Sequence, residues 1–305
     1  MLGELVKHHR TQIGLTQEAL AEEVGITAST LSRIERGITY PETKILLKMF
    51  DKLGISHINV SDMLMTKEMA KYQAMMDELD NCLSRCKADE AIKIIAQLRM
   101  DKQFMSDDDN KQYITAAEAV VAVDRNECPE RIIASLQDAM RKNGRDFDEN
   151  NLKKYVLGQN DFRVLNMLAI YYHETEKTNA AISILNALIE YIEERIIDKM
   201  VRGQRYPQTA YNLARFLQQA GRYYDAIDVC ERGKKVCIST SRFKFLPLLN
   251  LEKAKCFVEI GNRDDAIVLL REVYHASSMF EDNDSKNDVK KYIEERLPGI
   301  VLTMW

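Results

Sequence analysis

Residues 15–37 read LTQEALAEEVGITASTLSRIERG, and this stretch decides the fold of the N-terminal part of the chain. Thr16 is a natural N-cap for a helix over Gln17–Val24. Gly25 supplies the left-handed residue that ends a helix and permits a sharp turn. A second helix is predicted at Ala28–Arg36. Two short helices joined by a three-residue corner are typical of a helix-turn-helix.

The flanking residues predict three more helices around this pair. The first has one apolar face and ends at Gly14. Pro41 opens the fourth at a position where a missing N–H costs nothing, and that helix runs to Gly54. Asn59 with Asp62 three residues later has the spacing of a capping box for a short fifth helix. The N-terminal part is therefore predicted to be a five-helix domain.

The second helix of the central pair carries small residues and long polar residues at the positions that would face the major groove of DNA. A helix that enters the major groove must present such residues to base edges, and Ala28, Ser29, Ser32 and Arg33 meet this requirement. The net charge is −4, and no half of the chain is basic. A strong sequence-independent grip on nucleic acid is therefore not expected, because such a grip grows with the number of phosphates neutralised.

The stretches 15–21, 25–27 and 30–37 resemble the phage-repressor-type (Cro/C1, XRE) helix-turn-helix, a lambda-repressor-like fold. The resemblance implies base reading by Ser29 and Arg33, with Ala28 and Ser32 beside them. It implies phosphate contacts at six residues: Gln17, Thr27, Thr30, Arg36, Tyr40 and Lys44.

The same resemblance implies a semi-buried ion pair between Arg10 and Glu35, which ties the first helix to the recognition helix. Ala28 departs from the amide side chain often found at its position. The base at that position is then read weakly, or through a contact between Ala28 and a thymine methyl group.

Glycine and proline are scarce in this chain. The 305 residues contain 12 Gly and 5 Pro, whereas average usage of about 7% and 5% would give about 21 and 15. This scarcity predicts an all-α protein and excludes a β-sandwich, a doubly wound sheet and a glycine-rich nucleotide-binding fold. No GxGxxG, GxxxxGK or GxSxG motif occurs. We therefore expect no enzyme, no catalytic residues and no cofactor.

Metal, disulfide and membrane signals are also weak. Six cysteines form no CxxC pair, and five histidines are scattered without ligand spacing. We expect buried cysteines in a reducing cytosol and no metal site. No apolar stretch approaches the length of a membrane span, and the start of the chain does not resemble a signal peptide. These features predict a cytoplasmic protein.

The region 67–305 shows internal repeats after a helix predicted over Lys67–Cys86. Units recur every 40–45 residues, and each places an Ala-Ile pair in its second helix: Ala181-Ile182, Ala226-Ile227 and Ala266-Ile267, with weaker echoes at Ala91-Ile92 and near Ala134. The pattern resembles the tetratricopeptide repeat, although the period is longer than about 34 residues. We place a DNA-binding domain at 1–66 and a repeat domain, for ligand binding and dimerisation, at 67–305. The apolar C-terminal end, 300–305, is expected to pack on the last repeat or on a partner chain.

Stacked helix pairs form a right-handed superhelix whose inner wall is lined by the first helix of each pair. Amide side chains on such a wall suit an extended peptide backbone, and cations suit its terminal carboxylate. We predict peptide contacts at Arg163, Asn166, Ile170, His173, Gln208, Tyr211, Asn212, Arg215, Gln218 and Lys255. The alternative for each residue is an ordinary solvated helix face.

A repressor-type helix-turn-helix followed by about five degenerate repeats resembles the RRNPP group of Gram-positive quorum-sensing regulators, nearest in layout to PlcR-like and Rgg-like members. The resemblance implies a cytoplasmic homodimer that reads a double-stranded DNA operator under the control of a short signalling peptide. The alternative function is a DNA-binding regulator whose repeats bind a protein partner or only dimerise, without a peptide ligand.

Overall fold

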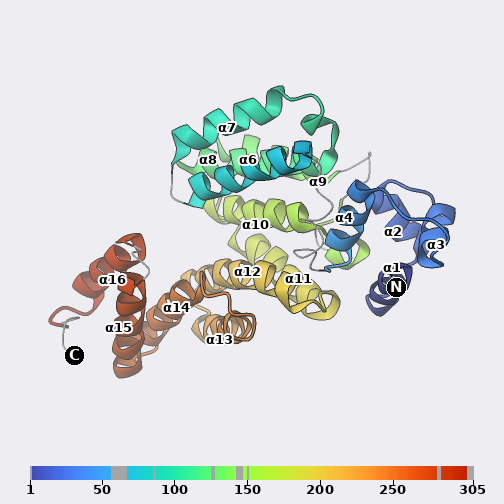
Figure 1. The fold of residues 1–305 in the computed structure, drawn as a ribbon. Coiled ribbons are helices and arrows are strands. Elements are labelled where there is room, and N and C mark those ends of the chain that lie inside the picture. Colours follow the sequence, from blue (N-terminus) through green and yellow to red (C-terminus); the bar gives the residue numbers. More distant parts are fainter. Residues whose placement is uncertain are drawn as a thin grey trace. The chain divides into compact units, whose positions relative to one another are not determined.

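The computed structural model of the protein describes residues 2–55, 67–84, 87–124, 128–141, 147–149, 151–279 and 283–300. Every regular element in these ranges is a helix, so the predicted all-helical fold is confirmed (Figure 1). The chain divides into two compact units, Met1–Val201 and Arg202–Trp305.

The first unit begins with four described helices, which we call the head. They are α1 (Leu2–Gln12), α2 (Gln17–Val24), α3 (Ala28–Glu35) and α4 (Thr43–Lys52). Thr16 Oγ1 accepts a hydrogen bond from Ala19 N at 3.1 Å, and Gly25 adopts φ 77°, which only glycine adopts readily. The head has its own core, formed by Val6, Ile13, Leu20, Ala21, Val24, Leu31, Ile34, Leu46, Met49, Phe50, Leu53 and Ile55.

Four predicted helix ends in the head are shifted. The fourth helix ends at Lys52, two residues before Gly54. The fourth helix begins at Thr43 and not at Pro41, because Glu42 still has extended backbone with ψ 149°. The third ends at Glu35, with Arg36 as its C-cap. The first ends at Gln12, two residues before Gly14. The fifth helix expected at Asn59 and Asp62 falls outside the described residues.

The rest of the first unit is built from antiparallel helix pairs. It contains α6 (Lys67–Ser84), α7 (Ala88–Met100), η1 (Phe104–Ser106), α8 (Asp108–Asp124), α9 (Pro129–Met140), η3 (Leu152–Lys154), α10 (Gln159–Glu174) and α11 (Thr178–Arg195). Helix α6 confirms the predicted helix from Lys67 as far as Ser84, since 85 and 86 are not described. Helix α10 packs against α8, α9 and α11.

The second unit starts within α12 (Lys199–Gln219) and continues with α13 (Tyr223–Ser239), α14 (Leu246–Glu259), α15 (Arg263–Met279) and α16 (Asn283–Arg296). Each of the helices from α13 to α16 packs on the next. Ile300 packs against the last core, whereas 301–305, including Trp305, lie outside the described residues.

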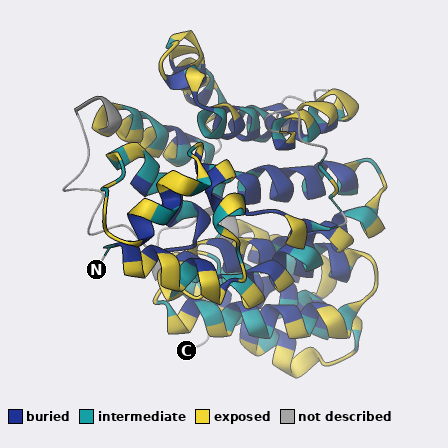
Figure 2. Ribbon diagram, turned by 90° about the vertical axis from the view of Figure 1, so that its right-hand side faces the viewer, coloured by how far each residue is buried: buried dark blue, intermediate teal, exposed yellow. Residues whose placement is uncertain are grey.

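The Ala-Ile pairs explain how the repeats pack. The four alanines, Ala91, Ala181, Ala226 and Ala266, are all fully buried at 0% exposure. A methyl side chain at these points lets the backbones of paired helices approach closely. Figure 2 shows the result, with buried residues on the inner sides of the helices and exposed residues on their outer sides. The tetratricopeptide-like repeats are therefore confirmed.

Candidate nucleic-acid interface

Helix α3 presents its polar side to solvent. Leu31, Ile34 and Glu35 are buried, whereas Ser29 and Arg33 are exposed on the opposite side. The helix begins at an N-cap, where Thr27 Oγ1 accepts a hydrogen bond from Thr30 N at 3.1 Å. Small side chains at the start of the helix and a long cation one turn later make a surface that can approach base edges.

Most of the ten residues predicted to contact DNA are exposed. Thr27, Ser29, Thr30, Arg33, Arg36, Tyr40 and Lys44 are exposed, and Gln17, Ala28 and Ser32 are half-buried. Tyr40 is 86% exposed, which is unusual for an aromatic ring. A surface groove of about 460 Å³ is lined by Thr30, Arg33 and Tyr40 among others. This groove lies beside α3, next to residues that are predicted to contact DNA.

Gln17 has a structural partner that its predicted phosphate contact did not include. Its Nε2 donates to Glu35 Oε2 at 2.7 Å. Glu35 also accepts from Arg10, with Nε–Oε1 at 2.5 Å and Nη2–Oε2 at 3.0 Å, so the implied ion pair is present. Burial opposes ionisation of Glu35, but the hydrogen bonds from Arg10 and Gln17 outweigh it and hold the pKa of Glu35 below its ordinary value. The pair fixes α3 on α1.

Two lysines of α4 face an acidic corner at the start of α8. Lys44 Nζ lies 2.9 Å from Asp107 Oδ2, and Lys48 Nζ lies 3.2 Å from the same oxygen and 3.4 Å from Asp109 Oδ2. Burial disfavours the charged form of Asp107, but the hydrogen bond from Lys44 and the charge of Lys48 prevail and lower its pKa. Lys44, which was predicted to contact a DNA phosphate, therefore forms an ion pair within the protein.

One turn further along α4, Lys52 is buried in the first unit. It is 3% exposed, and its Nζ lies 2.9 Å from Asp161 Oδ2 and 3.5 Å from Glu23 Oε2. Burial lowers its pKa, but the charges of Asp161, Asp109, Glu23 and Asp51 prevail and raise it. Lys52 therefore stays charged in the core and holds the head to α10.

The N-terminus of α10 is built around the same contact. Asp161 accepts from Gly158 N at 2.7 Å and from Gln112 Nε2 at 3.1 Å. Asp51 accepts from Gln159 N at 3.1 Å. A Cβ on Gly158 would lie 2.3 Å from Asp51 Oδ2, so a larger residue there would force the Asp51 side chain to shift.

The contacts of Lys48, Lys52, Asp107 and Asp161 were not predicted from the sequence. A signal was present, because Lys44, Lys48 and Lys52 recur every four residues and therefore share one face of α4. Within the acidic triplet 107–109, Asp107 caps α8, since its Oδ1 accepts a hydrogen bond from Asp109 N at 2.9 Å.

In the first unit, the predicted peptide contacts lie on α10. Arg163 Nη2 is 2.7 Å from Asp80 Oδ2, and its guanidinium stacks 4.7 Å above the Tyr113 ring. Asn166 is buried rather than open, with its amide donating to Phe162 O at 2.9 Å. Ile170 and His173 are half-buried. Their contacts with a peptide stay predictions.

In the second unit, the predicted contacts lie on α12 and α14. Gln208 is exposed, Asn212 is buried, and Tyr211, Arg215, Gln218 and Lys255 are half-buried. Lys255 Nζ is 2.7 Å from Glu252 Oε1. Arg215 Nε is buried without a hydrogen-bond partner in the described part of the chain. Of the three predicted carboxylate-binding cations, Arg163 and Lys255 already have acidic partners, which leaves Arg215 as the best placed for a ligand.

The described ranges show neither a metal cluster nor a membrane span. They contain no group of three or more His, Cys, Asp or Glu side chains placed to hold a metal ion. None of their helices has both the length and the apolar character that a membrane crossing requires. The five described cysteines, Cys82, Cys128, Cys230, Cys237 and Cys256, are free thiols.

Two family models match the chain. The helix-turn-helix model matches residues 6–58, and the RNPP family C-terminal domain matches residues 148–286. An uncharacterized HTH-type transcriptional regulator of Methanothermobacter thermautotrophicus is 41% identical over 54 residues, which are 18% of this chain and 78% of that protein. The HTH-type transcriptional regulator SinR of Bacillus licheniformis is 33% identical over 78 residues, 25% of this chain and 68% of SinR.

Solved structures with the same architecture cover nearly the whole chain. Bacillus thuringiensis PlcR, in complex with the peptide PapR7 and DNA, has a TM-score of 0.59 at 18% identity, covering 97% of this chain and 98% of PlcR. ComR of S. thermophilus, with DNA and its signalling peptide ComS, has a TM-score of 0.55 at 15% identity, covering 97% and 99%. The pheromone receptor Rgg2 of Streptococcus dysgalactiae has 0.52 at 13%, covering 97% and 100%. The fold is shared.

Proposed function

This chain belongs to the helix-turn-helix transcriptional regulators of the RNPP family, and from that membership we propose that a short signalling peptide bound by its repeats controls its binding to an operator. It is a DNA-binding regulator and not an enzyme. PlcR and ComR, which share its fold, have been solved with both DNA and a peptide. The observation that supports DNA reading most directly is the exposed polar side of α3, with Ser29, Thr30 and Arg33 beside the groove.

The proposal includes an organisation of the chain. Residues 1–66 form the DNA-binding domain, and 67–305 form the linker helix, the repeats and the dimer interface. A homodimer reads two operator half-sites, because a helix-turn-helix dimer binds half-sites about one helical turn apart. The protein acts in the cytoplasm, where DNA and an imported peptide are both present. A peptide that binds one arrangement of the repeats better than another shifts the equilibrium between them.

Replacing Arg33 by Ala is expected to weaken binding to an operator by about 1–3 kcal/mol and to relax base preference, since Arg33 reaches bases in this proposal. The operator is first selected by the protein from random duplexes, and affinities are then measured by fluorescence anisotropy. Arg36→Ala is the matched control. It removes a phosphate contact, so it should weaken selected and unselected DNA equally. Equal effects of both variants would contradict base reading by Arg33.

The peptide is tested with synthetic peptides that cover short open reading frames adjoining the gene. A cognate peptide is expected to raise the Tm of the full chain, because a ligand that binds only the folded state stabilises it. It should also change the affinity for the selected operator, whereas a peptide of scrambled order should do neither. A peptide that binds without any change in operator affinity would contradict peptide control and leave dimerisation or a protein partner as the function of the repeats.

A further inference from the structure

The acidic corner at the start of α8 forms ion pairs with two lysines of the head. Asp107 is buried, with its side chain only 6% exposed, and both Lys44 and Lys48 point at its Oδ2. One carboxylate oxygen shared by two ammonium groups has the geometry that a backbone phosphate oxygen offers to such cations. Lys44 itself is 58% exposed, so it lies at the edge of the contact and is accessible from solvent.

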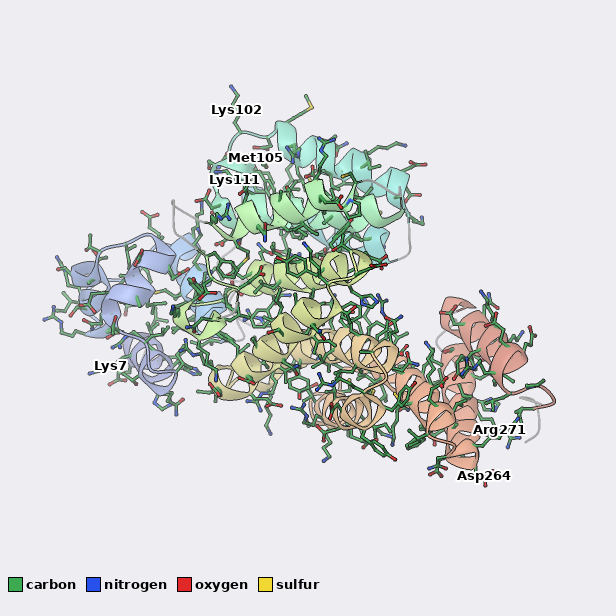
Figure 3. All side chains as sticks on the ribbon, turned by 180° about the vertical axis from the view of Figure 1, so that it is seen from behind. Lys7, Lys102, Met105, Lys111, Asp264 and Arg271 are labelled. Atoms are coloured by element: carbon green, nitrogen blue, oxygen red, sulfur yellow. The ribbon has the colours of Figure 1, made fainter. Side chains whose placement is uncertain are left out.

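The other described lysines near this corner are directed elsewhere. Lys111 Nζ pairs with Asp108 Oδ1 at 2.6 Å. Lys102, labelled in Figure 3 together with Met105 and Lys111, points away from the helical body. The described partners of the Asp107 carboxylate are therefore the two α4 lysines and the α8 backbone.

We propose that Asp107 is an intramolecular phosphate mimic that competes with DNA for Lys44 and Lys48. While the head is docked, Ser29 and Arg33 on α3 stay exposed and can meet bases, but two cations are withheld from the DNA backbone. Release of α4 from the corner adds them to the interface. The proposal rests on the proposed function, operator binding by the head, and on the phosphate contact predicted for Lys44.

The contact can adjust the affinity for DNA, because its strength lies between that of a buried ion pair and that of an exposed ion pair. Lys48 and Asp107 are largely desolvated, so their pairing is stronger than that of an exposed pair, whereas the Lys44 side chain remains exposed to solvent. Lys52 and Asp161 hold the far end of α4 regardless of Asp107. A change at the corner therefore alters the charge that the head offers to DNA without removing its main attachment.

The test measures salt-dependent binding of the full chain to a fluorescent duplex of arbitrary sequence, since phosphate contacts carry no sequence information. Asp107→Asn is expected to raise affinity on the order of tenfold and to steepen the slope of log K against log salt by about 1.8, as two more phosphates are neutralised. Asn keeps the side-chain oxygen that caps α8, so the fold should be retained. Asp228→Asn on α13 is the matched control, which removes one exposed acid without touching the head.

Lys44→Ala distinguishes the possible outcomes. In the Asp107→Asn background it should reverse about half of the gain in affinity. An unchanged slope in Asp107→Asn, or a gain that Lys44→Ala and Lys48→Ala together fail to reverse, would overturn the phosphate mimic. If Arg36→Ala also leaves binding unchanged, the assigned DNA surface itself is wrong. If Arg36→Ala weakens DNA binding as expected, only the proposal about Asp107 is wrong.

Discussion

Replacing Glu35 by Gln is expected to lower the free energy of unfolding of the head by about 3–5 kcal/mol, because it leaves the Arg10 guanidinium buried without its counter-charge. Arg10 is 8% exposed and Glu35 is 5% exposed. The glutamine side chain can accept one hydrogen bond but cannot match the two-point contact that Arg10 makes with the carboxylate. Hydrogen exchange at the amides of Leu20 and Leu31 in the full chain measures this loss, since a multidomain chain does not unfold in a single step.

The pH dependence gives an independent check. The pKa of Glu35 is lower in the folded head than its ordinary value of 4.5. The carboxylate therefore stabilises the head above about pH 4.5, and this contribution disappears as the pH falls through the lower folded pKa. In Glu35→Gln, the stability of the head should therefore fall less as the pH is lowered. Glu22→Gln, an exposed acid on α2, should leave both the stability and the pH profile unchanged, and equal behaviour of the two variants would contradict the role of the buried pair.

Local chemistry made the head and the repeats predictable. The bounds of α2 follow from Thr16 and Gly25, because a capping hydroxyl and a left-handed glycine act on adjacent residues. The buried alanines of the repeats were visible for a similar reason, since Ala226 and Ala266 recur at a fixed spacing in matching helices. Helix starts that depend on a single backbone torsion, as at Glu42, were the least predictable.

The docking of the head was not predictable, because its partners are far apart in the chain. Lys48 and Asp107 are separated by 59 residues, and Lys52 and Asp161 by 109. The lysine spacing on α4 shows that one face is cationic, but a phosphate and a buried carboxylate satisfy that face equally well. Only the packing of α4 against α8 and α10 decides between them. The sequence pattern that assigned Lys44 to DNA therefore could not show that Asp107 competes for the same lysine.

Lys52 and Asp161 have a different role from the corner lysines, because both are almost completely buried. Asp161 lies in the first turn of α10, the helix that carries Arg163, Asn166, Ile170 and His173, the predicted peptide contacts of the first unit. Their ion pair joins the head directly to a helix with predicted ligand contacts.

Asp161→Asn is expected to destabilise the first unit by about 3 kcal/mol, the lower end of the range for breaking a buried pair, since Glu23 remains 3.5 Å from Lys52. The asparagine side chain still accepts the hydrogen bond from Gly158 N, so the start of α10 keeps its cap. The loss then reports the unpaired charge of Lys52. Faster hydrogen exchange at Leu46, Met49 and Phe50 of α4 is the measurement.

Adding Lys52→Met to Asp161→Asn should restore part of that stability, because the buried lysine charge is removed and Met fills the space of the lysine stem, while Glu23 loses its contact with Lys52. A double-mutant cycle over the two positions is expected to give a coupling energy of about 2 kcal/mol. Additive effects would mean that the two side chains stabilise the unit separately and that the head is not attached through their charges. The repaired double variant should also bind DNA like the wild type, because Lys44, Lys48 and Asp107 are unchanged in it, and this separates attachment of the head from competition for its phosphate-binding lysines.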